Sequence, residues 1–167
     1  MNTKGLILVF TGDGKGKTTA AMGTALRMIS HGKRVGMVLF FKKGARESFL
    51  GTRFKTWGFG GGFTWETTRE ENAKAVQKAW GKCRELLRDP KCNLVILDEI
   101  HIALKYEFLK TAEVIKVLKK RPAAQHVILT GRGAPRGLLK AADLVTEMKC
   151  LKHPFKRGIL AQPGIEF

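Results

Sequence analysis

A glycine-rich stretch near the start of the chain constrains the fold more than any other feature. It reads Thr11-Gly12-Asp13-Gly14-Lys15-Gly16-Lys17-Thr18-Thr19. The apolar segment 5–10 before it is typical of a buried strand, and the segment after it has the apolar spacing of a helix. A strand, a glycine loop ending in Gly-Lys-Thr and a helix form the context of a phosphate-binding loop. We therefore expect residues 12–19 to bind nucleotide phosphates through loop amides, the Lys17 charge and the helix N-terminus.

The loop departs from the usual spacing, G-x-x-x-x-G-K-[ST]. Only three residues separate Gly12 from Gly16, so the loop is one residue short or lacks its first glycine. An ordinary nucleotide pose therefore cannot be assumed. The alternative, a glycine turn with exposed lysines, is disfavoured by the flanking strand and helix.

A second feature completes a nucleotide site. The apolar segment Leu94–Leu97 predicts a buried strand that runs directly into Asp98 and Glu99. Acids at the carboxyl end of a strand can hold magnesium, directly or through water, and the Thr18 hydroxyl is a further magnesium ligand. An ordinary helix cap is the alternative, but the phosphate-binding loop favours the metal site. From spacing alone, the chain is predicted to bind Mg-ATP or Mg-GTP.

Alternating strands and helices predict the fold class. The expected strands are 5–10, 35–41, 94–97, 126–130 and 144–148, and the helices follow residue 17, Thr68, Thr111 and Arg136. Thr68 with Glu71 has the spacing of a capping box, although Thr67 with Glu70 would do as well. This order predicts an α/β, three-layer P-loop NTPase-like (RecA-like) fold with a mainly parallel sheet of five to six strands. Residues 42–62 and the tail 152–167 lack periodicity, and 42–62 is expected to be a loop. The length of 167 residues predicts a single domain, 1–167.

Composition limits the partners and the compartment. The net charge of +17 suggests a polyanion partner, but the basic residues are spread along the chain, so nucleic acid binding is not the favoured function. Cys83, Cys92 and Cys150 form no disulfide or metal pattern, and reduced thiols indicate the cytoplasm. We see no signal peptide and no apolar run long enough to cross a membrane.

The sequence resembles the P-loop type of ATP:corrinoid adenosyltransferase. The resemblance covers nearly the whole chain and rests on TGDGKGKTTAAMGTALR at 11–27, GFTWET at 62–67, LVILDE at 94–99, ILTGRGAP at 128–135, ADLVTEM at 142–148 and KHPFKRGILAQPGIEF at 152–167. The short loop is this family's own form, in which Asp13 replaces the usual asparagine. The GFTWET segment and the tail are more specific to the family than the loop.

The resemblance implies a reaction. In this family ATP lies reversed, the Co(I) of the corrinoid attacks the 5′ carbon of the ribose, and triphosphate leaves. The corrinoid supplies the nucleophile, so no side-chain base is needed. The residues implied in binding the triphosphate are Gly12, Asp13, Gly14, Lys15, Gly16, Lys17, Thr18 and Thr19, with Lys17 and Thr18 as the catalytic pair. Thr18 with Asp98 or Glu99 is implied to hold Mg²⁺, and Arg132 to contact nucleotide or corrinoid.

Two aromatic residues carry the implied corrinoid site. Phe63 and Trp65 resemble the pair that packs beneath the corrin, displaces the lower axial ligand and eases reduction to Co(I). From composition alone, aromatic residues beside a glycine run are more often part of the core. The family match reverses that preference.

The resemblance also implies the partners. They are ATP, a Co(I) corrinoid (cobalamin, cobinamide or cobyrinic acid a,c-diamide), a flavin-type reductase and a second copy of the chain in a homodimer. Many relatives carry an N-terminal extension over the partner's site, whereas this sequence starts at the first strand, so we expect a more open site or another cover. Two other interpretations stay open: a P-loop ATPase or kinase acting on nucleic acid or a small molecule, and a non-catalytic corrinoid-binding relative.

Overall fold

The computed structural model describes residues 4–42, 51–61 and 68–165. Its strands are β1 (Ile7–Thr11), β2 (Val35–Leu39), β3 (Phe54–Gly58), β4 (Leu94–Asp98), β5 (His126–Thr130) and β6 (Leu144–Glu147). Its helices are α1 (Lys17–Ser30), α2 (Arg69–Leu86), α3 (Ile100–Lys105), α4 (Thr111–Lys119) and α5 (Arg136–Ala141), followed by the 3-10 helix η2 (Pro154–Arg157).

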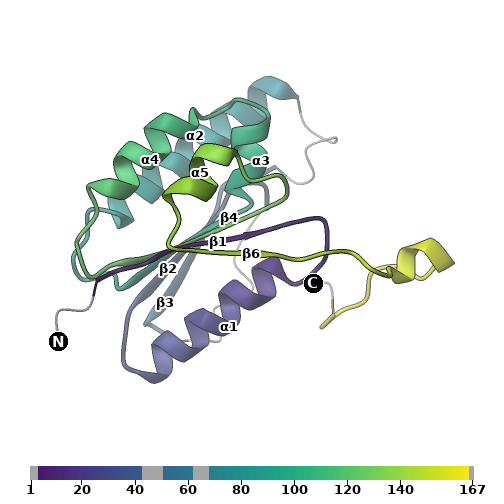
Figure 1. Ribbon diagram of the computed structural model, residues 1–167, viewed down its shortest axis with the longest axis horizontal. Coiled ribbons are helices and arrows are strands. Elements are labelled where there is room, and N and C mark those ends of the chain that lie inside the picture. The colour runs from purple at the N-terminus through teal and green to yellow at the C-terminus, as the bar shows by residue number, and fades with distance from the viewer. Residues whose placement is uncertain (1–3, 43–50, 62–67, 166–167) are drawn as a thin grey trace.

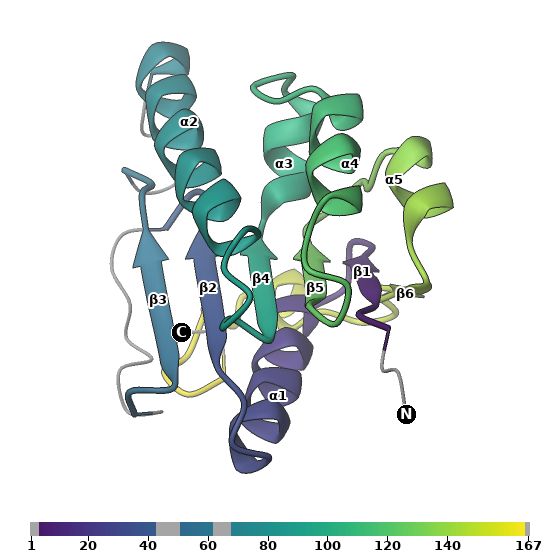
Figure 2. The same ribbon diagram turned by 90° about the vertical axis from the view of Figure 1, so that its left-hand side faces the viewer.

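The strands form one parallel sheet in the order β3-β2-β4-β5-β1-β6 (Figure 2). Helix α1 covers one face, and α2, α3, α4 and α5 cover the other (Figure 1). The predicted three-layer α/β fold is therefore confirmed. In such a sheet every strand ends at the same edge, so the loops that follow the strands meet there.

Strands β2 and β4 are buried along their whole length, and because successive side chains point to opposite sides, they contribute to the core on both faces of the sheet. Val9, Val38 and Val95 pack toward α2–α5, where the largest buried side chain is Trp80. Phe10, Met37 and Ile96 pack toward α1. The Trp80 indole donates a 2.8 Å hydrogen bond to Glu113, which ties α2 to α4.

Most predicted elements are present, and the expected loop over residues 42–62 is wrong in part. It contains β3, which pairs with β2 from residue 54 to 58. An edge strand has one neighbour and a half-exposed face, so it needs no continuous apolar run. The capping box of Thr68 and Glu71 is confirmed: each donates to and accepts from the other at the start of α2.

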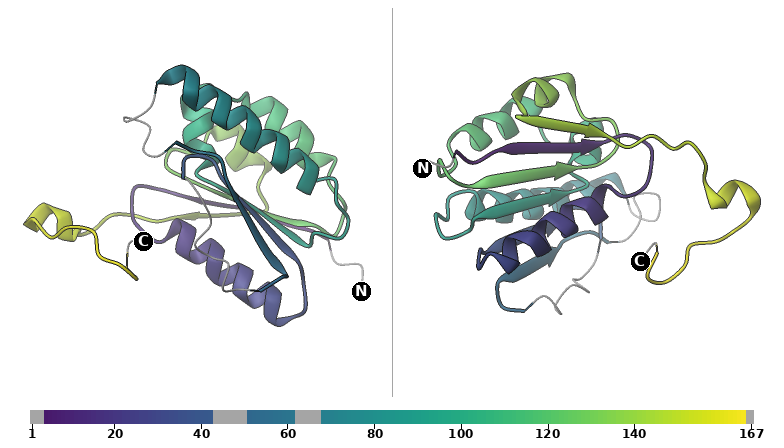
Figure 3. Two further views of the ribbon diagram at one scale, coloured as in Figure 1. Left: turned by 180° about the vertical axis from the view of Figure 1, so that it is seen from behind. Right: turned by 60° about the horizontal axis from the view of Figure 1, so that its bottom comes forward.

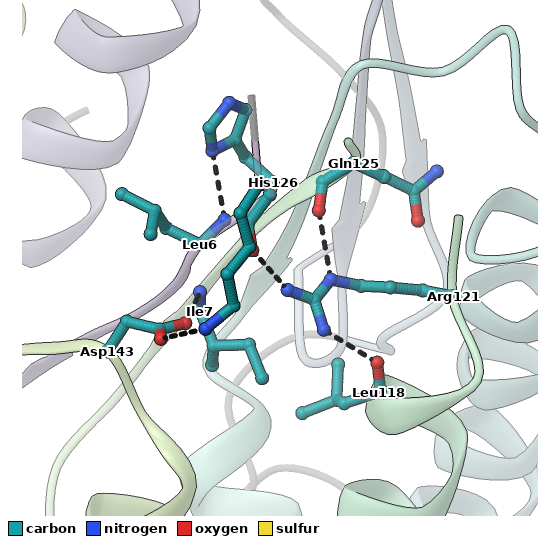
Figure 4. Close-up of polar contacts among 9 residues, drawn as sticks. Leu6, Ile7, Leu118, Arg121, Gln125, His126 and Asp143 are labelled. Atoms are coloured by element: carbon teal, nitrogen blue, oxygen red, sulfur yellow. Dashed lines mark hydrogen bonds and ion pairs between the residues drawn. The ribbon is translucent and has the colours of Figure 1, made fainter. Parts of the chain in front are cut away.

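A polar cluster fixes the amino-terminal end of the sheet, opposite the strand ends that the phosphate loop follows (Figure 4). The Arg121 guanidinium donates to the carbonyls of Leu118, Gln125 and Gly5 at 2.7–2.9 Å. The Leu6 amide donates to His126 Nδ1 at 3.1 Å, and the Ile7 amide donates to Asp143. These contacts hold the start of β1 against β5 and β6.

The chain beyond β6 extends away from the sheet (Figure 3). It carries exposed apolar side chains, among them Leu151, Phe155 and Leu160. In the part of the chain that the structure describes, no helix is long and apolar enough to cross a membrane.

Candidate active site

The glycine loop joins β1 to α1 and requires glycine at two positions. Gly12 and Gly16 have φ of 96° and 103°, in the left-handed region that favours glycine. A Cβ on Gly12 would also lie 2.4 Å from the Met148 carbonyl oxygen. The Gly14 amide donates to the same oxygen at 2.7 Å, so the end of β6 supports the loop from behind.

The N-terminus of α1 opens onto the loop. Its N-cap, Gly16, has no side chain to satisfy the first helical amides. The N–H groups of the first turn have no acceptor within the helix, and the helix dipole places positive potential there. This end of α1 can therefore bind an anion such as a phosphate group.

Lys17 is folded back over the loop. Its ammonium donates to the carbonyls of Gly12 and Gly14 at 2.7 and 2.6 Å, and the residue is 7% exposed. Burial lowers its pKa, the charge of Glu99 opposes that shift, and the charge of Arg132 adds to it. An ammonium has three N–H donors, and the described residues accept two of them, which leaves one for a phosphate oxygen.

Asp98 is the centre of a hydroxyl network at the end of β4. Its Oδ1 accepts hydrogen bonds from the hydroxyls of Thr18 (2.8 Å) and Thr130 (2.7 Å). Its Oδ2 is buried without a hydrogen bond among the described residues and lies 3.6 Å from the Lys42 ammonium. Side chains from α1, from β5 and from the segment after β2 thus converge on the Asp98 carboxylate, and this residue is 1% exposed.

Glu99 follows directly in a left-handed conformation, with φ of 63°. Burial raises the pKa of its carboxyl, and the neighbouring Asp98 charge raises it further. Its Oε2 is buried and has no hydrogen-bond partner in the described part of the chain. An unpaired buried carboxylate oxygen is costly unless a cation or a donor arrives.

These oxygens fit a hard cation. Thr18, Asp98 and Glu99 supply hydroxyl and carboxylate oxygens, the donors that Mg²⁺ prefers, and two of the carboxylate oxygens have no hydrogen bond among the described residues. Within the described residues no group of three or more His, Cys, Asp and Glu is placed to hold a metal by itself. The two neighbouring carboxylates of Asp98 and Glu99 suit Mg²⁺, which is usually held by one or two carboxylates together with substrate phosphates.

Arg132 lies in the loop after β5, between two glycines with positive φ, Gly131 and Gly133. It is exposed, and its charge adds to the lowering of the Lys17 pKa and opposes the raising of the Glu99 pKa. Lys17, Lys42 and Arg132 thus gather positive charge around the acids at one edge of the sheet. Of the other loop residues, Asp13, Lys15 and Thr19 are exposed.

Phe63 and Trp65 lie outside the described residues, so their expected place beneath a corrin stays a prediction. The structure adds residues that the sequence interpretation missed. Thr130 joins the Asp98 network, and its signal was a hydroxyl at the end of an apolar strand. His101 is fully buried beside Gly131, and no sequence pattern distinguished it from a core histidine.

Comparison with known proteins shows the family to which the chain belongs. Residues 3–167 match the sequence model of the ATP:corrinoid adenosyltransferase family BtuR/CobO/CobP. The chain belongs to this family. It is therefore an alkyl transferase of the corrinoid adenosyltransferase type, which moves the adenosyl group of ATP to a corrinoid, and the predicted function is confirmed at this level.

Individual corrinoid adenosyltransferases support the assignment along nearly the whole chain. A protein from Sinorhizobium sp is 47% identical over 98% of this chain and 81% of its own length. A Pseudomonas aeruginosa relative is 45% identical over 98% and 84%. The corrinoid adenosyltransferase CobA of Salmonella typhimurium is 44% identical over 98% and 86%.

A distant structural likeness supports the fold alone. The flagellar accessory protein FlaH from Methanocaldococcus jannaschii superposes with a TM-score of 0.59 at 11% identity. The match covers 87% of this chain and 71% of FlaH. At this identity the likeness says nothing about the adenosyltransferase reaction.

Proposed function

We propose that this adenosyltransferase transfers the 5′-deoxyadenosyl group of ATP to the Co(I) centre of a corrinoid in adenosylcobalamin biosynthesis or salvage. The cobalt donates an electron pair to C5′ and forms the cobalt–carbon bond. The C5′–O bond breaks, and its electron pair leaves with inorganic triphosphate. The corrinoid cobalt acts as both nucleophile and reductant, because it supplies the electron pair of the new bond. The reaction therefore needs no side-chain nucleophile.

The observation that carries the site assignment is the contact between Thr18 and Asp98 beside Lys17. We assign the triphosphate to residues 12–19 and to the N-terminus of α1. We assign Mg²⁺ to Thr18 and Asp98, with Glu99 completing the set. When bound, Mg²⁺ neutralises phosphate charge and so stabilises the leaving group.

The chain's own cations act on the same leaving group. Triphosphate gains negative charge as the C5′–O bond breaks, and preorganised positive charge stabilises that change. Lys17 is buried in the loop, and the described residues accept hydrogen bonds from two of the three N–H groups of its ammonium. Arg132 and Lys42 stand at the same edge and supply further positive charge. The protein's remaining task is to align C5′ with the cobalt.

The corrinoid side of the reaction involves residues that the structure does not describe. We assign Phe63 and Trp65 to the lower face of the corrin, where they exclude the axial ligand. A flavin-type reductase is the proposed electron donor, and the positive charge of the chain suits an acidic partner. We further propose that residues 1–167 fold as one domain, and that the enzyme is a homodimer of the cytoplasm.

The experiment that tests this function compares substrates. Purified protein receives Mg-ATP and one of three corrinoids under anaerobic conditions: cobalamin, cobinamide or cobyrinic acid a,c-diamide. Each corrinoid is first reduced chemically to its Co(I) form. We expect a light-sensitive alkylcobalt spectrum with at least one of them, and the largest kcat/KM identifies the preferred corrinoid. No alkylcobalt product with all three would contradict the proposed function.

A further inference from the structure

His101 has a hydrogen bond that determines its tautomer. The residue lies in α3, is 0% exposed, and its Nδ1 is 2.9 Å from the Gly131 carbonyl oxygen. A carbonyl oxygen only accepts, so Nδ1 carries the proton. Burial lowers the pKa of His101 to about 4, so the ring is neutral near pH 7 and Nε2 is an acceptor.

This side chain is not explained by packing alone. Nε2 is buried and has no hydrogen-bond partner among the described residues. An unpaired buried acceptor costs stability, and an apolar side chain would avoid that cost. What the histidine provides is the single N–H that holds the Gly131 carbonyl.

The backbone at Gly131 packs closely against His101 and Glu99. Its φ is 134°, and a Cβ there would lie 2.9 Å from His101 Cβ and 3.2 Å from Glu99 Oε2. The loop after β5 therefore rests directly on α3 and on a candidate metal ligand. A change in the His101 contact must move the Gly131 peptide or leave its buried carbonyl unpaired.

The next residue along the loop is Arg132. The loop that carries Arg132 is hydrogen-bonded to the end of β1, directly before the phosphate loop: the Gly131 amide donates to the Phe10 carbonyl at 3.2 Å, and the Ala134 amide donates to the Thr11 hydroxyl at 3.2 Å. Arg132 is exposed between these two contacts. The direction in which the Gly131 peptide is held therefore sets the point from which the Arg132 side chain extends beside the phosphate loop.

We propose that His101 is a positioning residue, which fixes the Gly131 carbonyl and thereby directs Arg132 toward the triphosphate of ATP. This inference rests on the proposed function, in which Arg132 serves the leaving group. It assigns His101 no contact with substrate.

Three variants separate positioning from packing. His101→Asn keeps an N–H at the δ position and can still donate to the Gly131 carbonyl. His101→Gln moves the amide one bond further out, and His101→Leu removes the donor while filling the space. The first readout is the dissociation constant for inorganic triphosphate with Mg²⁺, measured by calorimetry without corrinoid.

We expect His101→Leu to weaken triphosphate binding at least tenfold and to lower kcat/KM for ATP by a similar factor. His101→Asn should stay within about threefold of wild type on both measures. Thermal unfolding of each variant shows whether the fold is retained. If His101→Leu folds and binds triphosphate like wild type, the inference is overturned.

A double-mutant cycle tests the route through Arg132. In an Arg132→Ala background, His101→Leu should weaken triphosphate binding little further, because the guanidinium that His101 positions is already absent. A full, additive loss in that background would overturn the inference. If His101→Leu does not fold, Asn and Gln are compared, and equal triphosphate binding by both overturns it. Formation of alkylcobalt product by the wild type tests the proposed function separately from all these outcomes.

Discussion

The hydroxyl of Thr18 donates a 2.8 Å hydrogen bond to Asp98, a residue 80 positions further along the chain. One residue starts the helix after the phosphate loop, and the other ends the strand β4. Parallel strand ends bring the two together at one edge of the sheet. In the proposed function, this contact brings together a hydroxyl and a carboxylate that would hold Mg²⁺ beside the triphosphate.

The first prediction concerns Asp98→Asn, which removes the charge but keeps an oxygen that Thr18 and Thr130 can contact. The Mg²⁺ concentration for half-maximal activity should rise at least tenfold, because a neutral amide binds the cation more weakly. Titration of activity with Mg²⁺ at saturating ATP measures it. Asp89→Asn, a neutralisation at the end of the sheet away from the site, is the control. Equal Mg²⁺ requirements in both variants would exclude Asp98 as a ligand.

The second prediction concerns Lys17→Ala. Loss of a preorganised cation at a developing anion typically costs about 2–4 kcal/mol in the barrier, so kcat should fall by about 10²–10³-fold. Lys33→Ala removes the same charge beyond the far end of α1 and should keep wild-type turnover. Steady-state kinetics at saturating Mg-ATP measures both. Wild-type turnover in Lys17→Ala would refute the role of Lys17 at the triphosphate.

The third prediction concerns the aromatic pair. Phe63→Ala or Trp65→Ala should leave ATP binding intact. Activity should fall most when a weak flavin donor must reduce Co(II), and less when Co(I) is supplied chemically, because the pair acts on the reduction step. Assays with both reductants measure the difference, and the wild type with Mg-ATP and Co(II) corrinoid should show a four-coordinate cobalt spectrum. Equal losses with both reductants, together with a lower melting temperature, would indicate core residues instead.

The fourth prediction concerns pH and stability at the polar cluster of Figure 4. Burial, together with the charge of Arg121, lowers the pKa of His126. Its Nδ1 must be unprotonated to accept the Leu6 amide. A folded-state pKa below the unfolded value means that this contribution is complete above about pH 6.5 and is lost as the pH falls below it.

The matched variant is His126→Asn, whose side-chain oxygen can accept the Leu6 amide at any pH. The free energy of unfolding, measured in urea at pH 7.5 and 5.0, should fall less in the variant than in the wild type. An identical fall in both proteins would show that His126 does not carry this dependence.

Local sequence patterns predicted the elements that carry strong signals. The glycine loop, the capping box of Thr68 and the apolar strands each show their character within a few residues, because burial on both faces requires a continuous apolar run. Strand β3 was missed because an edge strand pairs on one side only, so Lys55 and Thr56 are tolerated within it. Helix α3 has only six residues, too few to show a helical period.

Some residues of the candidate site could likewise be predicted from local sequence patterns, and others could not. Lys17, Thr18 and Asp98 have fixed spacings relative to the loop and strand, so the sequence singles them out. Thr130 and His101 matter through contacts across the sheet, Thr130 to Asp98 and His101 to Gly131. Thr130 left only a weak signal, a hydroxyl at the end of an apolar strand, and His101 left none, so the arrangement of the strands is what reveals both contacts.

The measurement that tests the account most directly follows the phosphates of ATP. With Mg-ATP, a Co(I) corrinoid and no oxygen, adenosyl transfer breaks the C5′–O bond, whereas a phosphoryl-transfer enzyme breaks a bond at the terminal phosphate and yields ADP. We predict inorganic triphosphate in equal amount to the alkylcobalt product, with ADP at background. Absence of triphosphate with every corrinoid, together with ADP release stimulated by DNA or RNA, would contradict the account.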